Sequence, residues 1–339
     1  MITNNKEENT MKRSVKCISA VLTLVLALSL SLSALADPIR VAVVQPLTHT
    51  SLNQIRDTIV SELQNSGIDF EIVTRNTEGD SSALATILEN VKNDGVDILV
   101  PIATNTAQSA KMVFEDGDIP VVFAAVSDPV AAGLTGDDCS FITGVSNNIP
   151  AGEIVRLISD FQPEYKKIGF LYTSSETNSV STINAAKAYC DANGIVYEEA
   201  SIANLSELQT AAETLISKDV DALYTGNDNS IASAMSTYID VAYEYGVPVY
   251  CGADSMVADG GFATIGVDYV QLGRQVAAIV VRLTQGEQPE DIPYEVLSEY
   301  ARFVNLQAAE RIGMEIGSDI LASYKVLVEA DGTSHFGEQ

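Results

Sequence analysis

Short apolar runs rich in β-branched residues alternate with amphipathic stretches along most of this chain, and this alternation limits the fold more than any other feature. In the first part, strands are expected at 39–45, 69–74, 97–102 and 119–125, with helices at 52–66, 81–94 and 107–115 between them. Strand–helix alternation of this kind predicts a parallel sheet that is covered by helices on both faces.

The same alternation begins again in the middle of the chain, after a polar stretch at 141–150 that we expect to cross between two domains. Helices are expected at 153–160, 179–193, 205–217 and 230–245, and strands at 167–172, 195–200, 221–225 and 247–251. The last third predicts a strand at 262–269, a helix at 270–285, a strand or crossover at 291–300, and a strand entering a helix at 302–313. Two α/β units therefore stand in tandem.

The first 36 residues have the order of a secretory signal peptide. A basic head with Lys12, Arg13 and Lys16 precedes an almost wholly apolar run at 18–34, and Ala34-Leu35-Ala36 supplies the small residues of a cleavage site. The alternative is an uncleaved membrane anchor, although the run barely reaches spanning length. Met11 is a second candidate start, and Cys17 lacks the position of a lipoprotein cysteine.

Composition excludes several classes of partner. The 36 leader residues carry four basic and two acidic side chains, so the remainder has 15 basic and 44 acidic ones. A surface this acidic repels nucleic acid and anionic lipid. Cys139, Cys190 and Cys251 are far apart and odd in number, which favours buried free thiols over a disulfide framework, with a single bridge as the alternative.

Polar residues collect where the expected strands end, and in a parallel α/β sheet ligands bind at these carboxyl ends. The stretches concerned are Gln45 with the following P-L-T-H-T-S, then 103–108, 126–130, 173–179, 226–230, 252–255 and 267–269. Both units thus place small neutral donors and a few carboxylates at the same edge.

This chemistry suits a small zwitterion such as an amino acid. The expected helix starts near Asn105-Thr106 and Ser175–Ser179 can hold a carboxylate through free N–H groups and hydroxyls. The carboxylates of Asp128, Asp228 and Asp254 can accept hydrogen bonds from an ammonium group. Each residue alone also has a plainer explanation as a helix N-cap, a turn residue or a strand-end contact, so the prediction rests on their clustering.

Catalysis, cofactors and metals have little support in the sequence. His49 and His335 are the two histidines, and we expect His335 in a frayed tail at 330–339. The nucleophile-elbow, zinc-protease, P-loop and dinucleotide-binding motifs do not occur in the sequence, and no cysteine–histidine spacing suggests a metal site. A secreted hydrolase on a doubly wound fold is the weakest alternative, and His49 is expected at a pocket wall.

The strings P-I-A-T-N-T-A-Q, F-A-A-V-S-D-P-V, F-L-Y-T-S-S-E-T-N-S, T-G-N-D-N-S and I-G-V-D-Y-V-Q-L-G-R-Q follow one another in the chain. Together with the leader and the two units, they resemble the tryptophan/tyrosine-type family of ABC-transporter substrate-binding proteins over about residues 39–315. The resemblance implies a type I periplasmic-binding-protein fold: two doubly wound parallel-sheet lobes joined by three crossing segments. It implies one lobe at 38–148 plus 268–291, and another at 149–267 plus 292–329.

The resemblance also implies the pocket. In the first lobe its positions are Gln45, His49, Thr104, Asn105, Thr106, Ser127 and Asp128; in the second they are Ser174, Ser175, Glu176, Asn178, Ser179, Asn227, Asp228, Asn229 and Asp254, with Asp268 at the hinge edge. One loop departs, because T-H-T-S-L-N at 48–53 lacks both acidic residues common in the family, which leaves the identity of the ligand open. Tyr172, Tyr224, Tyr269 and Phe123 are candidates to stack on an aromatic ligand.

The resemblance implies an exported monomer, in a periplasm or at the cell exterior, that binds an amino-acid-like ligand and docks on a membrane permease. The alternative from another class is a ligand-sensing domain protein that partners a membrane receptor. Such a protein usually carries a further membrane or signalling segment, and none is expected after residue 329.

Overall fold

The computed structural model describes residues 37–297 and 300–337, so the predicted leader at 1–36 lies outside the described residues. The described residues from Arg40 onward form one compact unit. Across the described ranges, no helix is both long and apolar enough to cross a membrane.

Within the described residues, the first lobe is built on a six-stranded sheet in the order β11-β5-β4-β3-β1-β2. Its strands are β1 (Ile39–Gln45), β2 (Phe70–Asn76), β3 (Ile98–Pro101), β4 (Val121–Ala124), β5 (Ile142–Ser146) and β11 (Glu295–Val296). Its helices are α2 (Thr50–Asn65), α3 (Ser81–Asn93), α4 (Thr104–Val113) and α11 (Tyr269–Thr284), with short 3₁₀ helices η1 (Asp137–Cys139) and η3 (Pro289–Asp291).

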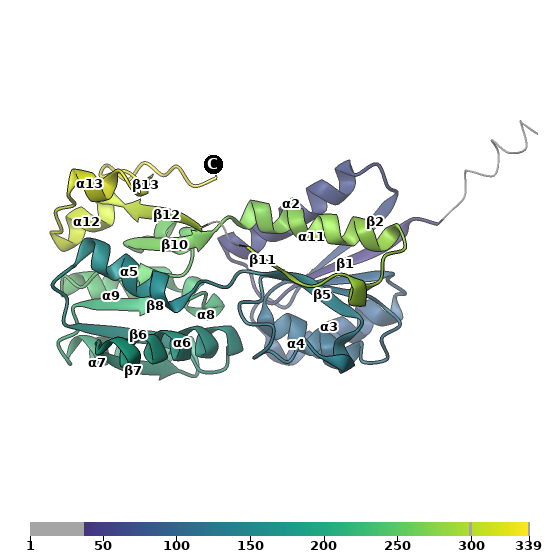
Figure 1. Cartoon of the computed structure of the whole chain (residues 1–339), viewed down its shortest axis with the longest axis horizontal. Helices are drawn as coiled ribbons and strands as arrows, with labels where there is room; N and C mark the ends of the chain where they lie inside the picture. The colour runs from purple at the N-terminus through teal and green to yellow at the C-terminus, as the bar shows by residue number, and fades with distance from the viewer. Residues whose placement is uncertain (1–36, 298–299, 338–339) are drawn as a thin grey trace, which may run out of the picture. The chain divides into compact units, whose positions relative to one another are not determined.

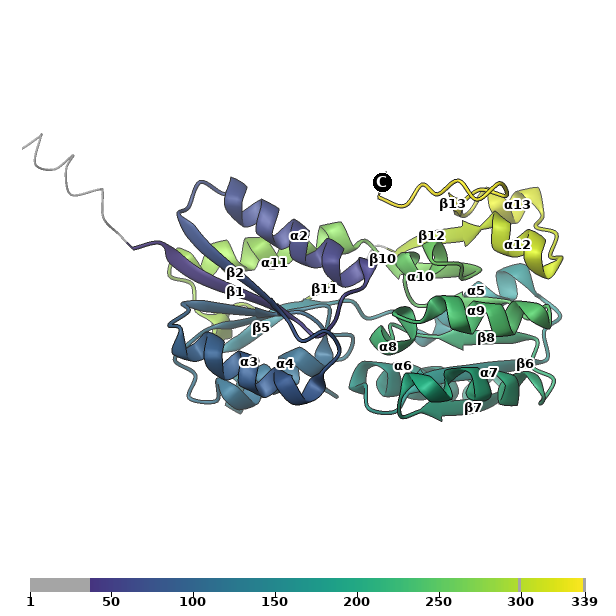
Figure 2. The same cartoon turned by 180° about the vertical axis from the view of Figure 1, so that it is seen from behind.

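Two pairs of helices cover this sheet. In Figures 1 and 2, α2 and α11 lie side by side on one face, and α3 and α4 lie on the other. The α2–α11 contact needs Gly273, because a Cβ atom there would lie 2.7 Å from Cβ of Thr58. Between the helix layers, β3 and β4 are buried at every position, which is why they read as continuous apolar runs.

The second lobe is built on a seven-stranded sheet, counted over the described residues, in the order β13-β12-β10-β9-β8-β6-β7. Its strands are β6 (Lys167–Thr173), β7 (Val196–Ile202), β8 (Ala222–Thr225), β9 (Val249–Cys251), β10 (Ala263–Val267), β12 (Tyr300–Asn305) and β13 (Lys325–Val328). All pairs are parallel except β10 with β12. The predicted fold, two parallel-dominated α/β sheets covered by helices, is therefore confirmed.

Helices cover both faces of this sheet as well. They are α5 (Ala151–Phe161), α6 (Thr177–Asn193), α7 (Leu208–Ile216), α8 (Asn229–Ala232), α9 (Met235–Glu244), α10 (Asp254–Ala258), α12 (Leu306–Ile312) and α13 (Ser318–Leu321), with the 3₁₀ helix η2 (Leu205–Glu207). Figure 1 shows α5 and α6 in front of the strands, and Figure 2, from behind, shows α7 and α9.

Three sequence expectations differ from the structure in the elements themselves. The stretch 141–150 was expected as a crossing segment, but its first half is β5, whose Thr143 and Ser146 hydroxyls donate to backbone carbonyls. The helix expected at 230–245 is split into α8 and α9 at Ala234. Within the tail expected to fray at 330–339, the segment at Ser334 and His335 instead pairs with β13, since the N–H of His335 donates to the carbonyl of Leu327 at 2.8 Å.

The third crossing of the chain also comes later than expected. The predicted division places residues 292–329 in the second lobe, whereas Glu295 and Val296 pair with β5 in the first sheet. The three cysteines in the described part of the chain, Cys139, Cys190 and Cys251, are free and buried, as predicted.

Candidate functional site

The carboxyl ends of the strands of both sheets meet at two cavities. The inner cavity has about 390 Å³ of space between atoms, part of it open to solvent. It is lined by His49, Ser51, Leu52, Ala125, Ser127, Asn147 and Tyr269 of the first lobe, and by Asn178, Asn227, Asp228, Asn229, Ala232, Ala253, Ser255 and Met256 of the second. A cavity shared by two lobes at these strand ends is where a doubly wound fold binds ligands.

A second, larger cavity lies beside the first and is called the outer cavity. It is lined by residues 46–48, 77–79, Leu84 and Asn105 of the first lobe, and by Thr173, Ser175, Glu176, 203–205, Asn229, Ser230 and Ser233 of the second. Asn229 lines both cavities, and its Oδ1 lies 3.1 Å from Nε2 of His49. The His49–Asn229 contact therefore joins the two lobes between the cavities.

Three further side-chain hydrogen bonds join the lobes directly. Oγ of Ser51 lies 2.5 Å from Oγ of Ser255, and the hydroxyl of Thr177 donates to Gln108 at 3.2 Å. At the same junction the hydroxyl of Ser181 donates to Asp128 at 2.6 Å. The lobes are thus in contact along this junction, and none of these bonds was visible in the sequence.

The predicted site residues divide into two groups. Nine line a cavity: His49, Ser127, Asn178, Asn227, Asp228 and Asn229 the inner one, and Asn105, Ser175 and Glu176 the outer one, which Asn229 also lines. The structure places eight outside both cavities: Gln45, Thr104, Thr106, Asp128, Ser174, Ser179, Asp254 and Asp268. Among the aromatic candidates, Tyr269 lines the inner cavity, whereas Tyr224 and Phe123 are core residues and Tyr172 bonds Glu199.

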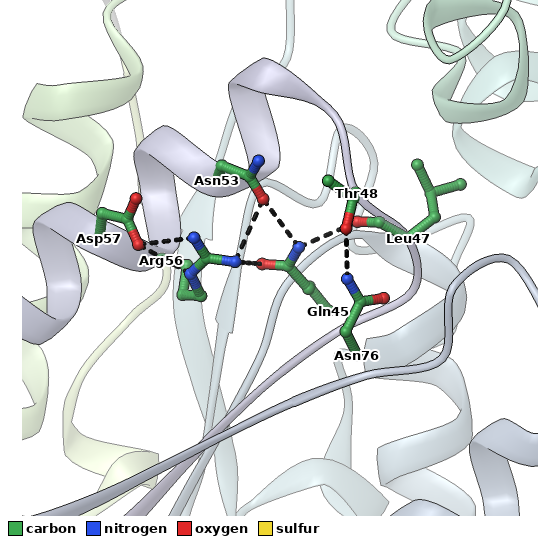
Figure 3. Close-up of polar contacts among 7 residues, drawn as sticks. All are labelled: Gln45, Leu47, Thr48, Asn53, Arg56, Asp57 and Asn76. Atoms are coloured by element: carbon green, nitrogen blue, oxygen red, sulfur yellow. Dashed lines mark hydrogen bonds and ion pairs between the residues drawn. The ribbon is translucent and has the colours of Figure 1, made fainter.

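Several residues outside the cavities have internal partners. Figure 3 shows Gln45 donating to Asn53 and to the carbonyl of Leu47, while Arg56 donates to Gln45 and Asn53. This network fixes the loop that leads to His49. The carboxylate of Asp268 caps α11 by accepting from the N–H of Gln271 at 2.9 Å.

Glu176 is buried and supports the second lobe. Its carboxylate accepts from the N–H groups of Asn229 and Ser230 at 2.9 and 2.8 Å, and from the hydroxyl of Ser230 at 2.7 Å. It also accepts from the side-chain amides of Asn229 and Asn178, at 2.8 and 3.2 Å. Because Asn178 lines the inner cavity, Ser230 the outer one and Asn229 both, Glu176 sets the position of that edge of the site.

Asp228 is fully buried beside Glu176. Its two oxygens accept from the N–H and hydroxyl of Thr173 and from the N–H of Ile231. Burial, followed by the charge of Glu176, raises the pKa of Asp228 to about 7. Burial also lowers the pKa of His49, against the opposing effects of Asn229 and Glu176, so the imidazole is neutral at pH 7.

The backbone at the edge of the first sheet is strained beside the inner cavity. Ala103 and Ala125, which follow β3 and β4, have φ angles of 73° and 58°. A non-glycine residue in this region costs on the order of 1–3 kcal/mol, and such positions cluster at ligand sites. Ala125 lines the inner cavity, and Ala103 precedes α4.

Sequence reasoning missed several lining residues. Ser51, Leu52, Asn147, Ser255 and Met256 line the inner cavity. Ser51 and Leu52 follow His49 by two and three positions, and Ser255 follows Asp254, so proximity to predicted residues was an available signal. Met256 follows Asp254 by two positions and shares this signal, whereas Asn147 carries none, because its place depends on how the two lobes meet.

The buried carboxyl group of Asp254 gives a pH prediction. Burial raises its pKa to about 6, so the native protein binds more protons than the unfolded chain between about pH 4 and pH 6. Stability is therefore lost as the pH rises through this window. Asp254→Asn keeps the acceptor for the N–H of Ser255 but does not titrate. As the pH rises from 4 to 7, we therefore expect the free energy of unfolding of this variant to increase relative to that of the unaltered protein by on the order of 2 kcal/mol.

Urea unfolding of both proteins at several pH values measures this difference. A difference that stays constant with pH would contradict the buried, proton-binding state of Asp254.

Residues 40–328 match the model of a family described as ABC transporter substrate binding protein. The chain is 28% identical to a tyrosine-binding protein of Clostridioides difficile over 282 residues, which is 81% of each chain.

Two solved structures are also similar. A domain of Streptococcus pneumoniae in complex with L-Trp is 32% identical, with a TM-score of 0.79, and covers 84% of this chain and 99% of that one. The ligand-free, open structure of a Clostridium difficile substrate binding protein with adhesive properties is 28% identical, with a TM-score of 0.65, and covers 85% and 98%.

Proposed function

The chain belongs to the family of ABC transporter substrate binding proteins, and from this premise we propose that it captures an aromatic amino acid between its two lobes. The observation that carries the proposal is the inner cavity, to which both lobes contribute side chains at the carboxyl ends of their strands. The names of two relatives support the ligand class, since one is a tyrosine-binding protein and the other holds L-Trp.

The walls of the inner cavity suit such a ligand. Leu52, Met256 and Tyr269 supply an apolar side, and thioether and aromatic groups both pack favourably on an aromatic ring. The polar side is supplied by the hydroxyl group of Ser127 and by the amide groups of Asn147, Asn178 and Asn227.

Closure of the lobes would accompany binding. The four direct side-chain bonds between the lobes, and the lower TM-score with the relative described as open than with the L-Trp complex, both support a closed arrangement here. A ligand that bridges both lobes shifts the balance toward this arrangement by its higher affinity for it. The closed protein then delivers its ligand to a membrane permease, as an exported monomer of an import system.

A thermal-shift screen against the twenty amino acids tests the ligand. Because the ligand binds only the folded protein, an amino acid at a hundred times its Kd adds about 2.7 kcal/mol of stability. We expect L-tryptophan or L-tyrosine to raise the melting temperature by several degrees, and acidic and basic amino acids to leave it unchanged. Isothermal titration then gives the affinity and stoichiometry.

A protein whose melting temperature responds to none of the twenty amino acids, but does respond to a sugar or a nucleoside, would overturn the proposal.

A further inference from the structure

Three buried polar atoms of residues that line the inner cavity have no hydrogen-bond partner among the residues that the structure describes: Nδ1 of His49, Oδ1 of Asn178 and Oδ1 of Asn227. The amide of Asn178 donates its Nδ2 to the carbonyl of Asn227 at 2.6 Å, which leaves Oδ1 as its free acceptor. An unpaired buried acceptor is costly, so each of these atoms favours a donor on the ligand.

The opposite lobe fixes which nitrogen of His49 is the acceptor. Nδ2 of Asn229 donates to the carboxylate of Glu176 at 2.8 Å, and this bond orients the amide because a carboxylate can only accept. Oδ1 of Asn229 therefore faces Nε2 of His49, and Nε2 must carry the hydrogen of that contact. In the neutral ring, Nδ1 then presents its lone pair as an acceptor.

We propose that the inner cavity binds the ammonium group of the ligand, which donates its N–H groups to Nδ1 of His49 and to the amide oxygens of Asn178 and Asn227. The inference rests on the proposed function and names the subsite within it. A primary ammonium group has three donors and no acceptor, whereas a carboxylate has no donor and a ring N–H or phenol has only one. The ammonium group alone matches three acceptors.

Asp228 contributes to this subsite as a charge. It lines the same cavity, but the bonds that its oxygens accept come from Thr173 and Ile231. A cation beside a buried carboxyl group stabilises the ionised form without direct contact. The subsite is complete only when the lobes meet, because His49 belongs to one lobe and the residues that set its tautomer belong to the other.

The test is a thermodynamic cycle that measures the affinities of two proteins, unaltered and His49→Leu, for two ligands, with and without the amine. Isothermal titration compares L-tryptophan with indole-3-propionate, which keeps the ring and the carboxylate but lacks the amine. For His49→Leu we expect a 10- to 100-fold loss of affinity for L-tryptophan, in the range of a hydrogen bond to a charged group. We expect less than a threefold change for indole-3-propionate.

The cycle removes a complication of the variant itself. His49→Leu also loses the contact with Asn229, and this loss weakens closure for both ligands equally, so only the difference between the ligands reports the ammonium contact. His335→Leu, at the other histidine of the chain, is the matched control and should bind both ligands as the unaltered protein does. If L-tyrosine is the ligand that binds, 3-(4-hydroxyphenyl)propionate replaces the indole compound.

Nitrogen-15 NMR of labelled histidine is an independent readout. With only two histidines in the chain, the His335→Leu spectrum assigns His49 directly. We expect a protonated Nε2 and an unprotonated Nδ1 at neutral pH.

A protonated Nδ1, or an equal loss of affinity for both ligands, would overturn the inference. So would an effect of His49→Leu that disappears with 1-methyl-L-tryptophan, which keeps the amine but lacks the ring N–H, because His49 would then contact the ring nitrogen. Failure of the unaltered protein to bind any amino acid would overturn the proposed function too, and the NMR result would still show whether the His49 tautomer was assigned correctly.

Discussion

Replacing Glu176 by alanine is expected to destabilise the protein by about 4 kcal/mol or more, because each buried donor left without a partner costs about 1–3 kcal/mol. The carboxylate accepts hydrogen bonds from the backbone N–H groups of Asn229 and Ser230, from the Ser230 hydroxyl, and from two asparagine amides. The side chain of Glu176 is almost fully buried, and alanine offers none of these donors an acceptor in its place. Urea unfolding and calorimetry measure the loss.

Glu207→Ala is the matched control for this change. Glu207 lies in the same lobe and accepts from the N–H of Ala203 and from the side chain of Asn204, but it is exposed, so water can satisfy these donors. A cost below about 1 kcal/mol is expected there. If the two variants unfold alike, the buried contacts of Glu176 do not support the lobe as the structure indicates.

The order of strands and helices was predictable because buried parallel strands leave a strong pattern. The runs around β3 and β4 are apolar at successive positions, and each is followed by an amphipathic helix. By contrast, β5 was missed because Thr143, Gly144 and Ser146 look like a loop. Its hydroxyls are satisfied by the carbonyls of Ile292 and Ser127, and such distant partners cannot be read from the local sequence.

The split of one expected helix into α8 and α9 has a local cause that was also easy to overlook. The hydroxyl of Ser233 donates to the carbonyl of Ser230, which competes with the helical hydrogen-bond pattern at that point. Ala234 then has φ of −126° and ψ of 25°, which ends one helix and begins the next. Apolar periodicity alone extends across this break.

The edge of the site was predictable, but the role of each residue in it was not. Polar groups at the carboxyl ends of the strands do line the cavities, as Asn178 and Asn227 illustrate. Asp128 stood in an equally suitable stretch, yet its carboxylate accepts from Ser181 on the other lobe. Gln45 likewise bonds Asn53 and Arg56. Whether such a group faces a ligand or another side chain depends on partners far along the chain.

Gly252→Ala is expected to abolish most ligand binding, because Gly252 lets two loops of the second lobe approach each other. A Cβ atom at this position would lie 2.5 Å from both N of Asn227 and C of Gly226. These are backbone atoms that cannot rotate away, so the loop at 226–229 must shift. That loop carries Asn227, Asp228 and Asn229 into the inner cavity.

The loss follows from the number of contacts that move together. If two or three hydrogen bonds to the ligand weaken, at about 1 kcal/mol each, the affinity falls by roughly 100-fold. Overpacking of this kind also costs about 1–3 kcal/mol of stability. Isothermal titration with the ligand found by the amino-acid screen measures the affinity, and urea unfolding measures the stability.

Gly266→Ala separates the effect of this clash from that of removing any buried glycine. Gly266 lies in β10 of the same lobe, and a Cβ atom there would lie 3.7 Å from its nearest neighbours, at ordinary contact distance. We therefore expect its ligand affinity to match that of the unaltered protein. Since Gly252 contacts the ligand-lining loop and Gly266 does not, an equal affinity in the two variants would mean that the loop at 226–229 does not set the geometry of the inner cavity.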